Sequence, residues 1–248
     1  MVQTTIFKII NDGEIAIQLY NPATDLEELL HVFREGFMKD STMFIAFEMN
    51  KPEAAQYRLE YEGLIPGILQ DGLSVIARHL PTMKIIGFCL NQLQSHPEGG
   101  QPTFYEAFHD SSETIVRKLL DFRIGKVKQM NLFEMYETEH IFETSYLGIL
   151  PEYRSRGIGY HLFECSIKIA REIANEKYPM TMIDGIKGKK PKIIFCSSSS
   201  EYSRKIAEKL NFAEVKRFPF EELKVNGVSF SEKIPPQHTH FAMCVFKL

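Results

Sequence analysis

Apolar residues recur along this chain at spacings that predict a particular order of strands and helices. Two short apolar runs, Ile6–Ile10 and Ile15–Leu19, flank an Asn-Asp-Gly sequence that is typical of a tight β-hairpin turn. Leucine and phenylalanine at three- and four-residue intervals over residues 26–37 predict an amphipathic helix. Residues 73–78 and 85–93 have the composition of two paired strands. The first part of the chain therefore combines strands and helices.

The rest of the chain continues this mixture. A long helix is predicted to end near residue 130, and an apolar strand over residues 142–150 precedes a second amphipathic helix. A strand over residues 192–197, a short helix over 202–210 and strands over 214–219 and 241–247 complete the pattern. Residues 223–240 are predicted to be a long polar connection. Because no repeat or break in composition marks a linker, we expect one α/β domain over residues 1–248.

The junction between the strand at 142–150 and the following helix carries the most informative sequence. This turn reads Arg154-Ser155-Arg156-Gly157-Ile158-Gly159. Glycine lets the backbone approach an anion closely, and the first N–H groups of a helix have no internal acceptor. The helix dipole and the two arginines add positive potential. The turn predicts a pyrophosphate site, with a solvated turn as the alternative. It is not the dinucleotide fingerprint, because the first glycine of that pattern is missing.

In this setting the turn resembles motif A of the GNAT acetyltransferases, here residues 142–175, which binds the pyrophosphate of acetyl-CoA. Residues 192–212 resemble motif B and end in Glu-Lys-Leu-Asn-Phe. The chain resembles most the insect-type arylalkylamine N-acetyltransferases, which share segments like residues 36–41 and 196–203 and a terminal segment from Pro236. The resemblance implies a single-domain α/β GNAT fold. That fold has a mixed, mostly antiparallel, twisted sheet of about seven strands, helices on both faces and a splayed central strand pair.

The resemblance also implies how acetyl-CoA is bound and used as cosubstrate. Backbone groups of the strand would bind the pantetheine arm, and the turn with the first helical residues would bind the pyrophosphate. These residues are Leu147, Gly148, Ile149, Leu150, Arg154, Ser155, Arg156, Gly157, Ile158, Gly159 and Tyr160. The implied reaction is direct attack of a small amine on the thioester, the amine being an arylalkylamine such as dopamine, serotonin or tryptamine. The alternatives are a catalytically weak CoA-binding protein and an acetyltransferase for a non-aryl amine or a peptide.

The general base does not follow directly from the resemblance, because Ser41 stands where the insect enzymes have glutamate. Asp40 precedes it and is one candidate. Glu143 is another, since it occupies a position where vertebrate arylalkylamine enzymes have histidine. Glu143 alternates with Ser145 and Leu147, so we expect all three on one strand face. An apolar cleft would raise the pKa of Glu143 toward neutrality, whereas a surface carboxylate is the alternative.

The sequence also leaves undecided which residue is the general acid. Many GNAT enzymes use a tyrosine at the place where this chain has Ala207. The insect-type resemblance instead implies Ser197 and Ser203 as catalytic serines. A serine near a helix start is also a common N-cap, and either Ser200 or Ser203 could serve in that way.

Aromatic and methionine side chains near the first helix have two explanations. They could line the mouth of the site and contact an aryl ring, or they could belong to the core. These residues are Phe37, Met38, Met43, Phe44 and Phe47.

Composition and charge argue against some classes of partner. A net charge of −3 with no basic stripe argues against nucleic acid, and the lysines at 187–192 lie among glycines and a proline, as in a solvated loop. The cysteines, Cys89, Cys165, Cys196 and Cys244, lack metal-ligand spacing, so we expect buried free thiols and no metal. No signal peptide or membrane-length apolar run is evident. A cytoplasmic monomer without membrane contact is therefore expected.

Overall fold

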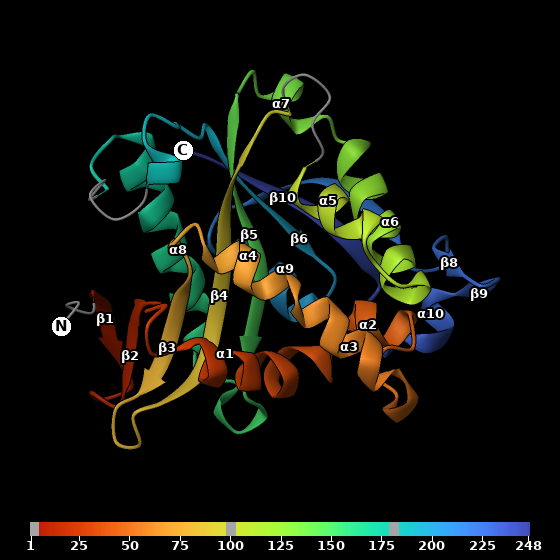
Figure 1. The fold of residues 1–248 in the computed structure, drawn as a ribbon, viewed down its shortest axis with the longest axis horizontal. Coiled ribbons are helices and arrows are strands. Elements are labelled where there is room, and N and C mark those ends of the chain that lie inside the picture. Colours follow the sequence, from red (N-terminus) through yellow and green to blue (C-terminus); the bar gives the residue numbers. More distant parts are fainter. Residues whose placement is uncertain (1–4, 98–102, 179–183) are drawn as a thin grey trace.

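The computed structural model describes residues 5–97, 103–178 and 184–248, and a single large sheet organises them (Figure 1). This sheet has eight strands in the order β1-β2-β3-β4-β5-β6-β10-β7, and β8 and β9 form a separate hairpin. The strands are β1 (Ile6–Ile10), β2 (Ile15–Leu19), β3 (Val75–His79), β4 (Lys84–Ser95), β5 (His140–Ile149), β6 (Ile193–Ser198), β7 (Ala213–Pro219), β8 (Lys224–Val225), β9 (Val228–Ser229) and β10 (His240–Lys247). The large sheet has one strand more than the resemblance implied, and each of its strands lies on a segment that the apolar pattern predicted.

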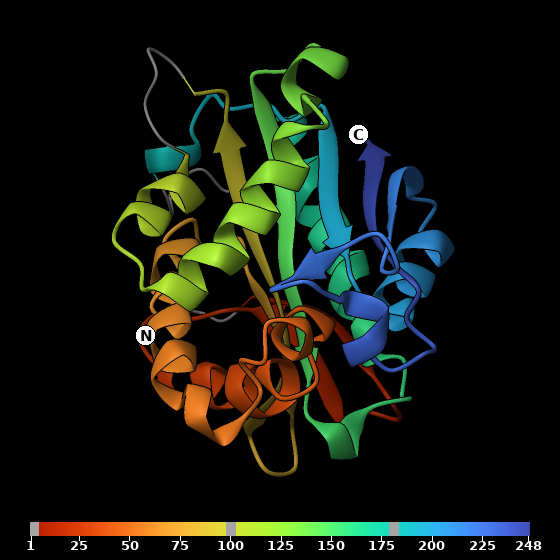
Figure 2. The ribbon, with the colours of Figure 1, turned by 90° about the vertical axis from the view of Figure 1, so that its right-hand side faces the viewer.

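Helices cover both faces of the sheet, as Figure 2 shows. The α-helices are α1 (Leu26–Phe33), α2 (Thr42–Ala46), α3 (Ala55–Glu62), α4 (Leu64–Leu69), α5 (Phe104–Asp110), α6 (Thr114–Lys128), α7 (Leu132–Met135), α8 (Ile158–Ala174), α9 (Glu201–Lys209) and α10 (Phe230–Lys233). A π-helical turn, η1 (Arg34–Met38), extends α1, and 3-10 turns occur at η2 (Pro52–Ala54), η3 (Pro151–Tyr153) and η4 (Asp184–Ile186). One core lies under α1, α3, α4 and α6, and the other lies under α8.

The one parallel pairing in the described sheet determines its shape. Strands β5 and β6 pair in parallel from Ile141 with Ile193 to Thr144 with Cys196, and α8 forms the crossover between them. All other neighbours in the large sheet pair antiparallel. Beyond Thr144, β5 continues to Ile149 against β4 alone, while β6 stays with β10. The two central strands therefore diverge, as the resemblance implied.

The segment at 223–240 is more ordered than a polar connection. It contains the β8–β9 hairpin and α10, whose N-cap Ser229 forms a capping box with Glu232. The sequence prediction was wrong here because Phe230 is fully buried and its ring packs against Phe47 and Phe122. A buried aromatic side chain and a capping box therefore accompany a short helix that propensity alone would not predict.

Candidate functional site

The turn predicted to bind an anion lies where β5 ends and α8 begins. Ser155 and Gly157 both adopt left-handed backbone, with φ of 62° and 78°, and Gly157 is the N-cap of α8. The N–H of His161 donates to the Gly157 carbonyl at 3.2 Å, so the three preceding N–H groups of the helix have no helical acceptor. Arg156 and Gly157 are exposed. The turn therefore presents free backbone donors and the positive end of a 17-residue helix at the surface.

The two arginines of this turn have different surroundings. Arg154 folds back onto the protein: it donates to the carbonyls of Ile149 at 3.0 Å and Gly36 at 3.1 Å, and it pairs with Asp40 at 2.6 Å. It thus joins β5, η1 and the residues after η1. The guanidinium of Arg156 lies 5.2 Å from the centre of the Tyr153 ring at the surface. Arg154 therefore ties the turn to η1, whereas Arg156 stays at the surface, where its Nη2 donates to the Glu152 carbonyl at 3.4 Å.

A β-bulge in β5 lies at the point where β5 leaves β6. Tyr146 pairs with Leu90 and Thr144 pairs with Asn91, so Ser145 is the extra residue. Tyr146 consequently belongs to the core under α1 and α6, and Leu147 packs with the core under α8. The predicted common face of Glu143, Ser145 and Leu147 was wrong for Leu147, because the bulge shifts the alternation by one residue.

Glu143 is buried, with 1% of its side chain exposed, and it faces charged and polar neighbours. Arg123 of α6 forms an ion pair with one carboxylate oxygen, and the Gln94 amide of β4 donates to the other. Burial raises the pKa of Glu143, and the Arg123 charge opposes that shift. Glu143 is therefore a buried, ion-paired carboxylate with a raised pKa, and not the surface carboxylate of the alternative.

Glu143 lies on the wall of a cavity of 710 Å³ between the sheet and α5, α6 and α7. Strands β4, β5 and β6 contribute Gln94, Ile141 and Phe195 to this wall, and Tyr105 and Arg123 come from the helices. The cavity thus reaches the paired side of the β5–β6 junction, directly before the strands diverge.

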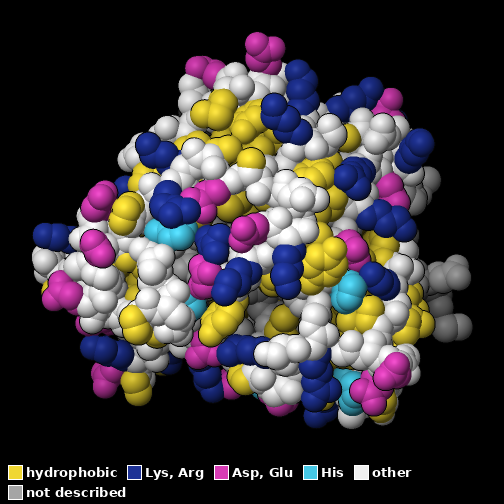
Figure 3. Space-filling view, turned by 180° about the vertical axis from the view of Figure 1, so that it is seen from behind, with side chains coloured by type: hydrophobic (Ala, Val, Ile, Leu, Met, Phe, Trp, Pro, Cys, Tyr) yellow, Lys and Arg dark blue, Asp and Glu magenta, His cyan; other side chains and the backbone are white. Residues whose placement is uncertain are grey.

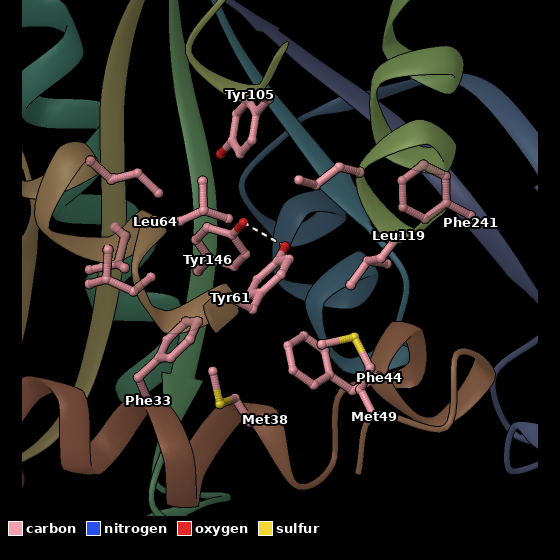
Figure 4. Close-up of a cluster of buried hydrophobic side chains, with 14 of the residues drawn as sticks. Phe33, Met38, Phe44, Met49, Tyr61, Leu64, Tyr105, Leu119, Tyr146 and Phe241 are labelled. Atoms are coloured by element: carbon pink, nitrogen blue, oxygen red, sulfur yellow. Dashed lines mark hydrogen bonds between the residues drawn. The ribbon is translucent and has the colours of Figure 1, made fainter. Parts of the chain in front are cut away.

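Three buried tyrosines lie near the bulge, and Tyr105 among them also lines the cavity. The hydroxyls of Tyr61 and Tyr146 are 2.8 Å apart, and Figure 4 shows them meeting within the buried cluster, near Tyr105. The Gln92 amide donates to the Tyr105 hydroxyl at 2.8 Å and to Ser145 Oγ at 2.9 Å. Burial raises the pKa of all three phenols, so they are neutral hydrogen-bonding groups. No local pattern predicted this network, because its members come from α3, α5, β4 and β5.

The remaining predicted catalytic residues lie apart from Glu143 in sequence and in contacts. Asp40 is exposed and paired with Arg154. Ser197 is half-buried on β6 opposite Met243. Ser203 is in the first turn of α9, where its N–H donates to the N-cap Ser200 at 3.1 Å and its hydroxyl donates to the Ser200 carbonyl at 3.0 Å.

The structure decides several alternatives that the sequence left open. Ser200, rather than Ser203, caps α9. Ala207 is fully buried and offers no hydroxyl. Met38, Phe44 and Phe47 are at most 5% exposed, so they belong to the core, whereas Phe37 and Met43 are partly buried against it.

Side chains that could bind a metal, react as thiols or attract a charged partner have the following arrangement. The described residues contain no cluster of His, Cys, Asp and Glu side chains that could hold a metal ion. All four cysteines are buried and free. Acidic and basic side chains are interspersed on the face shown in Figure 3. Within the described ranges, no helix is long and apolar enough to cross a membrane.

Comparison with known proteins identifies the fold. No protein-family model matches the chain. Arylalkylamine N-acetyltransferase 2 from Aedes aegypti is 16% identical, with a TM-score of 0.74 over 94% of this chain and 98% of that chain. The polyamine N-acetyltransferase of Drosophila melanogaster, which forms N-acetylagmatine, is 14% identical, with a TM-score of 0.72 over 95% and 100%. The C-terminal condensation domain of Ebony, in complex with β-alanyl-dopamine, is 15% identical, with a TM-score of 0.64 over 95% and 99%. The chain therefore has the GNAT fold that the resemblance implied.

Proposed function

We propose that this protein is an acetyl-CoA-dependent N-acetyltransferase that acts on a small amine, of the arylalkylamine type. The observation that carries the proposal is the divergence of β5 from β6 next to the exposed N-terminus of α8. Residues 147–149 of β5 have no partner on β6, although the Ile149 carbonyl accepts from Arg154 and the Leu150 N–H donates to Ile86 of β4. The turn and the free donors of α8 follow directly in the chain. An extended thioester arm that ends in a pyrophosphate fits both features. Proteins with this fold include an arylalkylamine N-acetyltransferase and a polyamine N-acetyltransferase.

The residues of the chain would divide the work in the following way. N–H groups of Ile158, Gly159 and Tyr160, together with Arg156, would hold the pyrophosphate. Free backbone groups of β5 beyond the bulge would hold the thioester beside the amine, which supplies proximity and a donor for the developing oxyanion. These contributions depend on backbone geometry, so they need no particular side chains.

Glu143 is the base that we favour over Asp40. It lies before the bulge, on the face of β5 that the amine would approach, and its raised pKa suits proton uptake near neutral pH. To take up the amine proton, a Glu143 oxygen would exchange the hydrogen bond that it now accepts from Arg123 or Gln94. Asp40 would act through Arg154 as a positioning residue. Ser197 and Ser203 are the hydroxyls proposed to protonate the leaving thiolate.

The experiment is turnover, measured as CoA release from acetyl-CoA with a panel of amines. The panel includes dopamine, serotonin, tryptamine, tyramine, agmatine, a polyamine and a basic peptide. Turnover of arylalkylamines above the others supports the proposal. Preference for agmatine or the polyamine would contradict the aryl assignment, and acetylation of the peptide alone would contradict the small-amine assignment.

A second candidate function is CoA binding without efficient catalysis. It is favoured by the fact that both candidate bases are already paired with arginine and that Ala207 offers no acid. Saturable binding of acetyl-CoA without turnover of any amine in the panel would support this candidate.

A further inference from the structure

A buried side-chain amide lies at the point where β5 leaves β6. Asn91 of β4 is fully buried, and it pairs with Thr144 directly before the bulge at Ser145. Thr144 is also the last residue of β5 that pairs with β6. A buried amide needs partners for two N–H donors and one oxygen, so its partners show which elements it holds together.

The side chain of Asn91 connects β5, α8 and the residue chain that leads into β3. Its oxygen accepts from the Thr144 hydroxyl of β5 at 3.1 Å. Its nitrogen donates to Ser166 Oγ of α8 and to the Leu73 carbonyl, both at 2.9 Å. A carbonyl can only accept, so the bond to Leu73 fixes which end of the amide carries the nitrogen. Asn91, Thr144 and Ser166 are called the Asn91 brace below.

The Asn91 brace closes the open end of a strand–turn–helix unit. Thr144 lies five residues before the end of β5 at Ile149, and Ser166 lies eight residues after the start of α8 at Ile158. At the usual rise per residue, the brace is about 17 Å from the end of the strand and about 12 Å from the start of the helix. The unit is therefore held at one end by the turn and at the other by Asn91.

The bond from Asn91 is the directional contact between this part of α8 and the sheet. The Ser166 hydroxyl donates to the Leu162 carbonyl at 3.1 Å, a bond that a serine within a helix forms without any outside partner. Its bond from Asn91 is additional. The other side chains that α8 buries here are mostly apolar, and apolar contacts are non-directional. The hydrogen bond therefore determines where α8 lies along β5.

We propose that Asn91 is a positioning residue for acetyl transfer, because its side chain sets the distance between the turn before α8 and residues 147–149 of β5. This assignment rests on the proposed function. Acetyl-CoA joins a pyrophosphate to a thioester through an arm of fixed length, so a cosubstrate held at both ends needs the two sites in register. A small displacement of one site moves the thioester away from the amine and lowers the rate.

The test compares acetyl-CoA with acetyl-pantetheine, which has the thioester but lacks the pyrophosphate and the nucleotide. Thr144→Val and Ser166→Ala each cut one arm of the Asn91 brace. With acetyl-CoA, kcat/KM should fall about tenfold or more in each variant, and with acetyl-pantetheine it should change less than about twofold. Loss of stability alone would lower both values together. A ratio of the two donors that is unchanged in both variants would overturn the proposal.

Ser112→Ala is the matched control. Ser112 is also buried, and its hydroxyl also donates to the carbonyl four residues earlier, that of Phe108, at 2.7 Å. It lies between α5 and α6, so the donor ratio should equal that of the wild type. The double variant Thr144→Val/Ser166→Ala should have a ratio close to that of the worse single variant, because either cut already opens the brace. Effects that multiply would contradict a single brace.

Native-state hydrogen exchange keeps the brace distinct from the proposed reaction. In Thr144→Val and Ser166→Ala, amides of residues 146–149 and 161–165 should exchange faster relative to those of β2 and β3, and Ser112→Ala should leave these relative rates unchanged. Calorimetry with acetyl-CoA is performed on the same samples. Faster exchange in both segments of a protein that binds no acetyl-CoA keeps the structural brace and overturns the reaction. Unchanged exchange with acetyl-CoA bound overturns the brace and leaves the reaction standing, and unchanged exchange without binding overturns both.

Discussion

At the scale of single residues, the molecule concentrates buried polar groups around the bulge in β5. Glu143, Ser145 and Tyr146 lie in the middle of the sheet, and each is less than 10% exposed. Buried polar groups are tolerated when they are paired, and most of these are paired with groups from other elements. The free energy spent in burying them is consistent with a site rather than with stability alone.

The Tyr61–Tyr146 hydrogen bond should contribute measurably to stability. Tyr61→Phe leaves the Tyr146 hydroxyl buried without its partner, which predicts a loss of about 1–3 kcal/mol in the free energy of unfolding. Urea denaturation measures this free energy of unfolding. The control is Tyr57→Phe, because Tyr57 is half-buried on the same helix. The double variant Tyr61→Phe/Tyr146→Phe should cost less than the sum of the single variants, because neither hydroxyl is then stranded. Strict additivity would mean that the two hydroxyls do not interact.

Glu143→Gln should lower kcat by about 100-fold or more, the range expected when a general base is lost. The affinity for acetyl-CoA should be unchanged, because Glu143 lies away from the turn at α8. Glu139→Gln, an exposed glutamate just before the same strand, is the control and should be as active as wild type. Retention of full turnover in Glu143→Gln would remove this residue from the mechanism.

The raised pKa of Glu143 predicts that kcat depends on pH. Burial raises the pKa of Glu143, so its carboxylate takes up a proton at a higher pH than an exposed glutamate does. A base works only when it is ionised, so kcat should fall as the pH drops through this raised pKa. Residual turnover by Glu143→Gln should lack that acidic limb. An identical pH profile for the two proteins would contradict the assignment.

At the scale of elements, the approach of η1 to the end of β5 positions the predicted thioester strand. A Cβ on Gly36 would lie 2.8 Å from the Ile149 carbonyl carbon and 2.9 Å from its oxygen, both backbone atoms that cannot turn away. Arg154 bonds the carbonyls of these same two residues. Gly36 and Arg154 therefore both hold η1 against the end of β5.

Gly36→Ala should force η1 away from β5. The expected loss is about 1–3 kcal/mol in the free energy of unfolding, the usual range for overpacking, together with weaker binding of acetyl-CoA. Gly125→Ala is a matched control in α6, where a Cβ would meet no atom within 4 Å. That substitution should stabilise the protein by about 0.5–1 kcal/mol through helix propensity. Thermal or urea unfolding of both variants measures the contrast, and equal effects would show that the close approach is unimportant.

At the scale of the whole molecule, local sequence predicted the order and type of the elements well. Period-two and period-3.6 patterns placed every strand of the large sheet and both α8 and α9. The turn between β5 and α8 was also predictable as a strand-to-helix junction, because glycine in left-handed backbone before a helix leaves a signature within six residues. Such features are local, so a single segment contains the information that specifies them.

Features formed by distant segments were not predictable. The bulge at Ser145 depends on the register between β4 and β5, and no local pattern revealed that Leu147 would change faces. Arg123 stands in an ordinary helical pattern, and only the packing of α6 on the sheet brings it to Glu143. The role of Arg154 depends on Gly36, which lies 118 positions earlier in the chain. Tertiary contacts, rather than propensity, determine these parts of the site.

The central claim is that the splayed strands and the α8 turn bind acetyl-CoA, and calorimetric titration with acetyl-CoA tests it most directly. We predict saturable binding of one molecule per chain, weakened by added salt because phosphates meet Arg156 and the helix N-terminus. Arg156→Gln should bind more weakly than wild type. Absence of saturable binding by the folded wild-type protein would contradict the claim, and the proposed acetyl transfer would fall with it.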